Sequence, residues 1–214
     1  MPRISQQNMR RLLKLYFIMG STNCMKNPEE VLTDSIKGGV TLFQLREKGN
    51  GAFTGEEKFE FAKKLQQICK SYDIPFIVND DVELAIALNA DGVHIGQEDE
   101  DAGSVRQKIG DKILGISAHN VVEAKRAIEQ GADYIGVGPM FPTKTKKDTR
   151  KVKGPSIFYE LLKEEIDIPM VGIGGITSEN AQEVLAAGAD GIAVISTISQ
   201  AESPLLVSRK LALI

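Results

Sequence analysis

An amide and two cations alternate with other residues in the segment Gln44-Leu45-Arg46-Glu47-Lys48. If a β-strand runs through this segment, Gln44, Arg46 and Lys48 share one face and Leu45 lies on the other. In a barrel the apolar face packs on outer helices, so the polar face points into the mouth. Two cations there need an anionic partner, because a buried unpaired charge is costly. A phosphate or diphosphate ligand is favoured; a structural ion pair with Glu47 or a neighbouring strand is the alternative.

Oxygen-bearing side chains follow the next two predicted strands, at Asn79-Asp80 and within His94–Asp99. Neighbouring strand ends bring these groups together, at the position where catalytic residues of barrels lie. Carboxylates that face a basic edge suit a Mg²⁺ that also binds a diphosphate. Asp80 and Asp99 are therefore the predicted metal ligands. Other nearby carboxylates are assigned to helix starts or to the surface, namely Asp81, Glu98, Glu100 and Asp101.

The two histidines, His94 and His119, are the obvious acid–base candidates. Each is more simply explained as a hydrogen-bonded core or edge residue, and no Ser/His/Asp arrangement follows from the spacing. Ser117, at the end of the fifth predicted strand, is a plausible polar contact to a substrate.

A second anion site is predicted at Gly172–Ile176 and at Ile195-Ser196, after the last two strands. Barrels often bind phosphate with these two loops and a helix N-terminus. Glycine lets backbone N–H groups approach the anion closely. The mouth would then hold one basic, metal-linked site and one site made of backbone amides.

The stretch Pro139–Pro155 is long and rich in lysine and arginine, and it follows the sixth predicted strand. Long loops at this place are often functional lids. A solvated charge run would explain some of its cations, but less well the Thr143–Lys146 group beside the strand end.

A loose repeat organises the chain: a helical pattern ends at a glycine or a small turn, and a short apolar run follows. Strict strand–helix alternation predicts an α/β fold with eight parallel strands, a (βα)8 TIM barrel, in a single domain over residues 1–214. A short N-terminal helix capped by Ser5 precedes it. No G-x-G-x-x-G opens a helix after the first strand, which disfavours a dinucleotide-binding sheet. The predicted strands are Leu15–Met19, Leu42–Arg46, Phe76–Asn79, Val93–Ile95, Ile113–Ser117, Tyr134–Val137, Met170–Ile173 and Ile192–Ile195.

The composition is that of an ordinary globular protein, with 214 residues, 42% hydrophobic and 26% charged. A net charge of −3 gives no reason to expect a nucleic-acid or membrane partner. No apolar run reaches the about 18 residues that span a bilayer, and Cys24 and Cys69 show no metal or disulfide pattern. A cytoplasmic location is the default expectation, and a homo-oligomer stays possible.

Taken in order, these motifs resemble the thiamine phosphate synthase family from about Tyr16 to Ala201, and no motif position departs from its pattern. The resemblance implies a transferase of thiamine biosynthesis. Such an enzyme joins 4-amino-2-methyl-5-hydroxymethylpyrimidine diphosphate to a thiazole phosphate and yields thiamine phosphate and pyrophosphate. The carboxylated thiazole phosphate is the expected bacterial substrate, and the decarboxylated form stays open as the alternative.

The resemblance also implies a role for each matching residue. Asp80 and Asp99 would bind Mg²⁺, and Ser117 would lie near the pyrimidine and the pyrophosphate. Gly175, Ile195 and Ser196 would bind the thiazole phosphate. The pyrimidine diphosphate would be held by the segment Gln44, Leu45, Arg46, Glu47 and Lys48, together with Asn79. The loop would supply Thr143, Lys144 and Thr145 to the thiazole, and Lys146 to the pyrophosphate.

A dissociative step would suit this site, because it needs stabilised leaving-group charge rather than an acid–base pair. The catalytic residues would be Arg46, Lys48, Ser117 and Lys146, with Mg²⁺. A thiazole tautomerase of the same fold would need no diphosphate site. A non-catalytic regulator would need no metal site, and other phosphate-binding barrels would need acid–base pairs that are not placed here.

Overall fold

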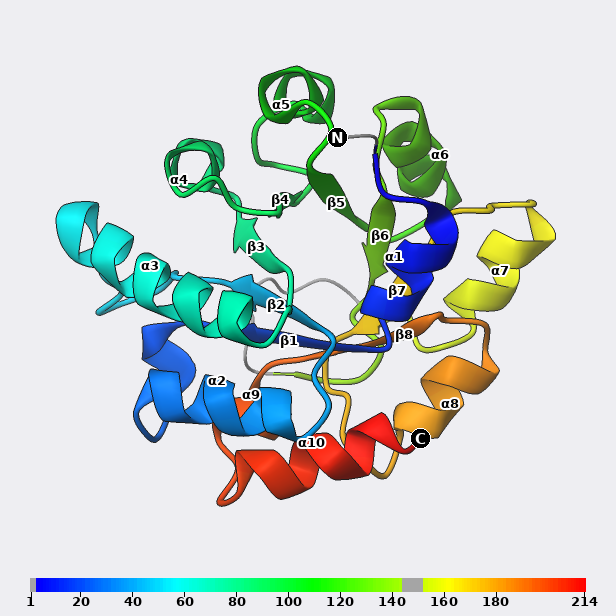
Figure 1. Ribbon diagram of the computed structural model, residues 1–214. Helices are drawn as coiled ribbons and strands as arrows, with labels where there is room; N and C mark the ends of the chain where they lie inside the picture. The colour runs from blue at the N-terminus through cyan, green and yellow to red at the C-terminus, as the bar shows by residue number, and fades with distance from the viewer. Residues whose placement is uncertain (1–2, 144–151) are drawn as a thin grey trace.

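The computed structural model describes residues 3–143 and 152–214, and its strands close into a parallel barrel in the order β1 to β8 (Figure 1). This confirms the predicted fold class. Four strands, β1, β3, β6 and β7, have the predicted bounds, and the others differ from the prediction by one residue at one end or at both. The strands are β1 Leu15–Met19, β2 Leu42–Leu45, β3 Phe76–Asn79, β4 Gly92–Ile95, β5 Ile113–Ala118, β6 Tyr134–Val137, β7 Met170–Ile173 and β8 Gly191–Val194.

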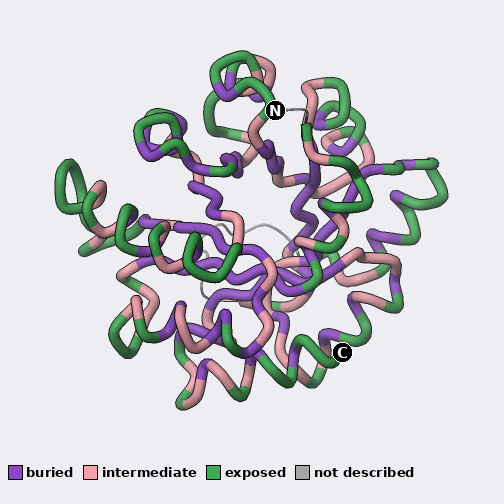
Figure 2. The backbone as a smooth tube through the Cα atoms, in the orientation of Figure 1, coloured by how far each residue is buried: buried purple, intermediate pink, exposed green. Residues whose placement is uncertain are grey.

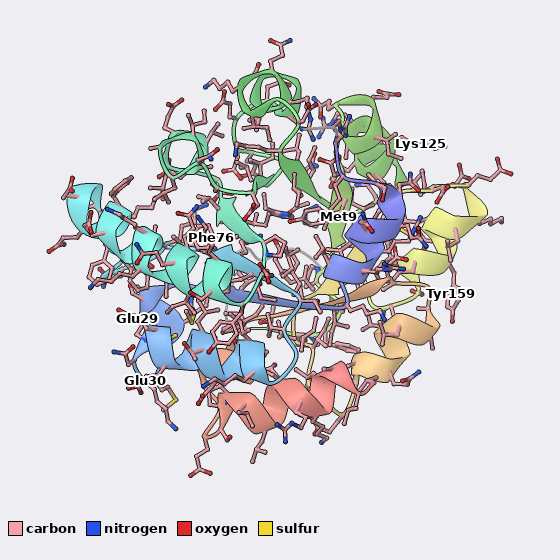
Figure 3. All side chains as sticks on the ribbon, viewed as in Figure 1. Met9, Glu29, Glu30, Phe76, Lys125 and Tyr159 are labelled. Atoms are coloured by element: carbon pink, nitrogen blue, oxygen red, sulfur yellow. The ribbon has the colours of Figure 1, made fainter. Side chains whose placement is uncertain are left out.

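Helices surround the barrel, and Figure 2 shows buried residues along the strands and exposed residues on the outer sides of the helices. Residues such as Glu29, Lys125 and Tyr159 lie on this outer ring (Figure 3). The helices are α1 Gln6–Leu12, α2 Pro28–Lys37, α3 Gly55–Ser71, α4 Val82–Ala87, α5 Ala102–Ile109, α6 Val121–Glu129, α7 Ile157–Lys163, α8 Ala181–Ala186, α9 Ser196–Ser199 and α10 Pro204–Ala212, with a 3₁₀ turn η1 at Ser21–Asn23.

Strand side chains alternate between two cores, as the pleat requires. Phe17, Phe43 and Phe76 point outward and pack in the layer between strands and helices. Tyr16, Leu42 and their neighbours point inward and form a separate cluster inside the barrel. Near the carboxyl ends of β2 to β5 the inner face carries Gln44, Asn79, His94 and Ser117, so the apolar interior gives way there to a polar mouth.

A polar residue lies immediately before each even-numbered strand, and its side chain accepts a hydrogen bond from the start of the preceding strand. The first backbone N–H groups of β3 and β7 donate to the carboxylates of Asp91 and Asp190, and the N–H of Leu114, the second residue of β5, donates to Asp133, each at 2.8 Å. The N–H of Leu15 at the start of β1 is donated in the same way to Thr41 Oγ1 at 3.0 Å. The turns that end the helices therefore also hold the starts of the preceding strands, because an aspartate or threonine follows each of these turns.

Helix α1 closes the amino-terminal end of the barrel. Ser5 caps it by accepting a hydrogen bond from Asn8 N, as predicted. Met9 and Leu13 pack into the inner cluster, and Met9 is labelled in Figure 3. Arg10 ties the helix to Asp190 at 2.6 Å. Substrate access is thus directed to the opposite, carboxyl-terminal end.

No helix within the described residues is both long and apolar enough to span a membrane.

Candidate functional site

A cleft of about 510 Å³ opens at the carboxyl ends of the strands. Loops after several strands contribute to its lining, which makes it the natural place for chemistry in this fold. Ten of the residues expected from the sequence line it, namely Arg46, Lys48, Asn79, Asp80, Asp99, Ser117, Thr143, Gly175, Ile195 and Ser196.

The basic edge of the cleft follows β2. Among the described residues the guanidinium of Arg46 makes no hydrogen bond or ion pair, although it lines the cleft. Lys48 forms an ion pair with Asp80. A guanidinium without a protein partner, held at the lip of a cleft, is suited to an anionic ligand.

Glu47, which was expected to contact substrate or to pair with a cation, lies behind this edge and is only 7% exposed. Its carboxylate accepts hydrogen bonds from Ser21 N at 2.7 Å, from Ser21 Oγ at 2.5 Å and from Phe53 N at 2.8 Å. Glu47 therefore joins the loop after β1 to the loop after β2. Arg46 and Lys48 are its neighbours in sequence, so these hydrogen bonds also hold the backbone of both cations. Leu45 likewise packs in the outer core, away from the cleft.

An acidic pair faces the basic edge. Asp80 has a left-handed backbone (φ 62°), a strained conformation that concentrates at functional sites. The side chains of Asp80 and Asp99 are in hydrogen-bonding contact. Burial raises the pKa of Asp80, and the charge of Asp99 adds to this against the opposing effect of Lys48. Burial also acts to raise the pKa of Asp99, but hydrogen bonds from Asp80 and from Gly96 N lower it overall.

Two adjoining carboxylates also suit a hard divalent cation. Within the described residues no cluster of three or more His, Cys, Asp or Glu side chains could hold a metal ion. Mg²⁺ is nevertheless bound in many enzymes by one or two carboxylates, with water and substrate phosphate completing the shell. Asp80 and Asp99 supply that donor set.

Below the cleft a hydrogen-bonded chain crosses the barrel interior. Gln44 Nε2 lies 2.6 Å from Tyr16 Oη, which lies 2.7 Å from Tyr134 Oη. His94 bonds Tyr134 Oη through Nδ1 and Ser117 Oγ through Nε2, each at 3.0 Å. Gln44 was expected at the mouth beside Arg46 and Lys48. It points inward as expected, but it lies below the mouth, in the barrel interior. Its partner in the sheet register is Ile77 of β3, which belongs to the inner apolar cluster.

The wall opposite the basic edge is formed after β7 and β8. Gly174 and Gly175 have positive φ angles of 101° and 67°. A Cβ on Gly175 would approach Pro142 O to 2.7 Å, so glycine is required where this turn meets the loop after β6. Helix α9 begins at Ser196, and the hydroxyl of Thr197 donates to Ile176 O at 2.5 Å. This wall exposes backbone and hydroxyl groups rather than charged side chains.

His119 lines the cleft and bonds Glu123 Oε2 through Nδ1 at 2.7 Å. The other expected loop residues, Lys144, Thr145 and Lys146, lie outside the described residues.

Sequence reasoning missed Tyr16, Tyr134 and Gln97 as parts of this site. Both tyrosines are fully buried in strands, where an aromatic residue is typical of a core. Gln97 lines the cleft and donates to Ser117 O at 2.6 Å. One signal could have placed Tyr16. It shares a strand face with Ile18, which pairs with Gln44, so its hydroxyl is expected on the same inner face as Gln44.

Comparison with known proteins gives a consistent result. Residues 15–198 match the model of a family described as thiamine monophosphate synthase. A curated thiamine-phosphate synthase from Bacillus mycoides (strain KBAB4) is 61% identical over 212 residues, which are 99% of this chain and 97% of that protein. One from Bacillus cereus (strain ATCC 10987 / NRS 248) is 62% identical over 95% of this chain and 91% of its own length. The solved structure of a thiamine phosphate pyrophosphorylase from Pyrococcus furiosus is similar with a TM-score of 0.85 and 37% identity, covering 95% of this chain and 96% of that one.

Proposed function

This chain belongs to the thiamine monophosphate synthase family, and from that premise we propose the reaction and the roles of its residues. An enzyme of this type is a transferase of thiamine phosphate biosynthesis. The proposed substrates are 4-amino-2-methyl-5-hydroxymethylpyrimidine diphosphate and the carboxylated thiazole phosphate. The proposed products are thiamine phosphate and pyrophosphate, together with the CO₂ that the carboxylated thiazole ring loses.

The observation that carries this proposal is the guanidinium of Arg46, which lines the cleft without a protein partner in the described residues. Together with Lys48 and Asn79 it would bind the diphosphate of the pyrimidine substrate. Charged hydrogen bonds directed at the leaving oxygens become stronger as negative charge develops there, so they lower the barrier to departure. Lys146 would add a further cation from the loop.

The donor set of Asp80 and Asp99 would hold Mg²⁺, which when bound supplies positive charge to the diphosphate. The chain's own part is to keep both carboxylates at one place, through the left-handed turn at Asp80 and the hydrogen bond that Asp99 accepts from Gly96 N at 2.7 Å.

The wall after β7 and β8 would bind the phosphate that is retained. Gly175 allows close approach of backbone amides, and Ile195 and Ser196 continue the same surface. Thr143, Lys144 and Thr145 would contact the thiazole. Two anions held on opposite walls would fix the ring nitrogen in line with the carbon that loses pyrophosphate.

The proposed bond breaking is dissociative: the C–O bond to pyrophosphate breaks first, and the thiazole nitrogen then donates its electron pair to the carbon. Such a step requires no general base, which fits the pairing of His119 with Glu123. Water must be excluded from the cation, and this is the proposed task of the residues 139–155. Both substrates are phosphorylated and cross membranes poorly, so the proposed location is the cytoplasm.

The test is an assay of purified protein with both substrates and Mg²⁺, measuring pyrophosphate release and thiamine phosphate together. Equal yields of the two products are expected. Competition between carboxylated and decarboxylated thiazole phosphate should favour the former. The proposal is wrong if saturating substrates give no thiamine phosphate. Asp99→Ala and Lys146→Ala should reduce turnover much more than they reduce thermal stability.

A further inference from the structure

The hydrogen-bonded chain below the cleft joins residues of five strands. It runs from Gln44 through Tyr16, Tyr134 and His94 to Ser117, with consecutive distances of 2.6, 2.7, 3.0 and 3.0 Å. Gln44 is 1% exposed and His94 is 8% exposed. Only Ser117 at one end and His94 beside it reach the cleft.

The number of hydrogens sets the direction of donation along this chain. Burial raises the pKa of Tyr16 and of Tyr134, so each hydroxyl keeps its single hydrogen at neutral pH. Gln44 Nε2 donates to Tyr16 Oη. Tyr16 then donates its hydrogen to Tyr134, and Tyr134 donates to Nδ1 of His94. His94 is left with its hydrogen on Nε2, which is donated to Ser117 Oγ.

The opposite direction is costly. Tyr16 would then accept from both Gln44 and Tyr134, and its own hydrogen would have no acceptor among the described residues. A buried donor without a partner costs more than a formed hydrogen bond contributes. One polarity is therefore favoured throughout.

Glycines on β5 and β6 make room for this chain. A Cβ on Gly115 would overlap the Tyr134 ring and lie 2.5 Å from His94 Nδ1. A Cβ on Gly136 would lie 3.2 Å from His94 Cε1. Both glycines point inward, at positions where barrel interiors usually carry large branched side chains. The space is used by the Tyr134–His94 contact, whose ring centroids are 5.5 Å apart.

We propose that Tyr16 and Tyr134 are positioning residues, which hold His94 in the Nε2–H tautomer so that the Ser117 hydroxyl, as acceptor from His94, turns its own hydrogen into the cleft. This inference rests on the proposed function for its ligand: the hydroxyl donates to an acceptor atom of the pyrimidine diphosphate. Sequence reasoning gave Ser117 a contact with that substrate, but it gave neither tyrosine a role.

The first test does not need activity. The chain has two histidines, so ¹⁵N-histidine labelling gives two ring spectra, and a His94→Gln variant assigns them. The wild-type protein should show His94 protonated on Nε2 and not on Nδ1. In Tyr134→Phe, which keeps the ring, the Nδ1 signal should shift and the Nδ1–H tautomer should gain population. Tyr16→Phe should change the spectrum in the same sense but less. A wild-type His94 that is protonated on Nδ1, or an unchanged spectrum in Tyr134→Phe, would overturn the proposal.

The second test uses the assay. Tyr134→Phe should lower kcat about tenfold, the loss of one positioned hydrogen bond, and leave KM for the thiazole phosphate unchanged. Tyr159→Phe is the matched control, since Tyr159 is 60% exposed on the outer face of α7. Thermal melting separates unfolding from misplacement. If Tyr134→Phe has the kcat of the wild-type enzyme, the positioning role is wrong. If the wild-type protein shows the expected tautomer but no synthase activity, only the proposed function is wrong.

Discussion

The ammonium of Lys48, just past β2, forms an ion pair with the carboxylate of Asp80, just past β3. Lys48 is half exposed, whereas Asp80 is largely buried and adjoins Asp99. The pair therefore connects the basic edge of the cleft to the acidic pair. Any cation that binds Asp80 competes with Lys48, and the displaced ammonium is then available to an anion that arrives with the cation.

Asp99→Asn should raise the Mg²⁺ concentration needed for half-maximal activity by about tenfold or more, since it removes one of two anionic ligands. Titration of activity with Mg²⁺ at saturating substrates measures this. Asp73→Asn is a matched control on the surface, because Asn tolerates the left-handed backbone of Asp73 (φ 56°). Equal Mg²⁺ requirements in Asp99→Asn and the wild-type enzyme would remove Asp99 from the metal site.

Asp80→Asn should make the metal-free protein more thermally stable while abolishing its response to Mg²⁺. The raised pKa of Asp80 reflects a carboxylate that burial and Asp99 disfavour, and the amide removes that charge. Differential scanning calorimetry with and without Mg²⁺ checks both halves. A variant that melts lower than the wild-type protein in the absence of metal would contradict the expected strain.

Glu47→Gln should destabilise the fold by about 1–3 kcal/mol, because an amide nitrogen would face a buried N–H donor where a carboxylate oxygen now accepts. Turnover should fall as well, since Arg46 and Lys48 flank this residue. Urea unfolding of the variant, with the exposed Glu129→Gln on α6 as control, gives the free energy. Unchanged stability would mean that the loops after β1 and β2 do not depend on this carboxylate.

The sequence predicted the barrel well because its information is local. Short apolar strands recur in every unit, a glycine follows α2, α5, α6 and α8 within two residues, and four strands have the predicted bounds. Helix α8 begins only at Ala181, since Asn180 Oδ1 accepts from Thr177 N and forms a turn first. Such competition between a side chain and the helix is not visible in an apolar pattern.

Parts of the site required three-dimensional register. Alternation placed Gln44 on the inner face, but only the pairing of β2 with β1 and β3 shows how deep it lies. Tyr16 and Tyr134 are 118 residues apart in sequence, and their hydroxyl contact depends on strand tilt and on the space left by Gly115. A tyrosine in an apolar strand is predicted to be a core residue from the sequence, whether or not its hydroxyl takes part in a series of hydrogen bonds.

Asp133→Asn should cost about 3 kcal/mol of unfolding free energy. Asp133 is 8% exposed, and its carboxylate accepts hydrogen bonds from Leu114 N, Arg3 and Arg106. The substitution removes the negative charge that pairs with the two arginines. Asp91→Asn, at the equivalent position of β4, should cost less than about 1 kcal/mol, because an amide oxygen can still accept from Phe76 N. Chemical denaturation of both variants makes the comparison, and equal losses would show that the arginines contribute nothing.

Glu123 should give the fold an acid-sensitive contribution. Burial acts to raise its pKa, but hydrogen bonds from His119 and Asn120 and the charge of His119 lower it overall below the ordinary 4.5. The folded state then binds this proton more weakly than the unfolded state does. Its stabilisation is complete above pH 4.5 and is lost as the pH falls through the lower folded-state pKa.

Glu123→Gln tests this directly, because glutamine keeps the shape and cannot titrate. The variant should be less stable than the wild-type protein by about 1 kcal/mol at neutral pH, as hydrogen bonds to a charged acceptor are lost. The difference should shrink as the pH falls below 4.5. Glu129→Gln on the same helix, where the glutamate is exposed, should show no such trend. Denaturation curves over a pH series measure the gap, and a gap that stays constant down to acid pH would show that Glu123 is not preferentially ionised in the folded protein.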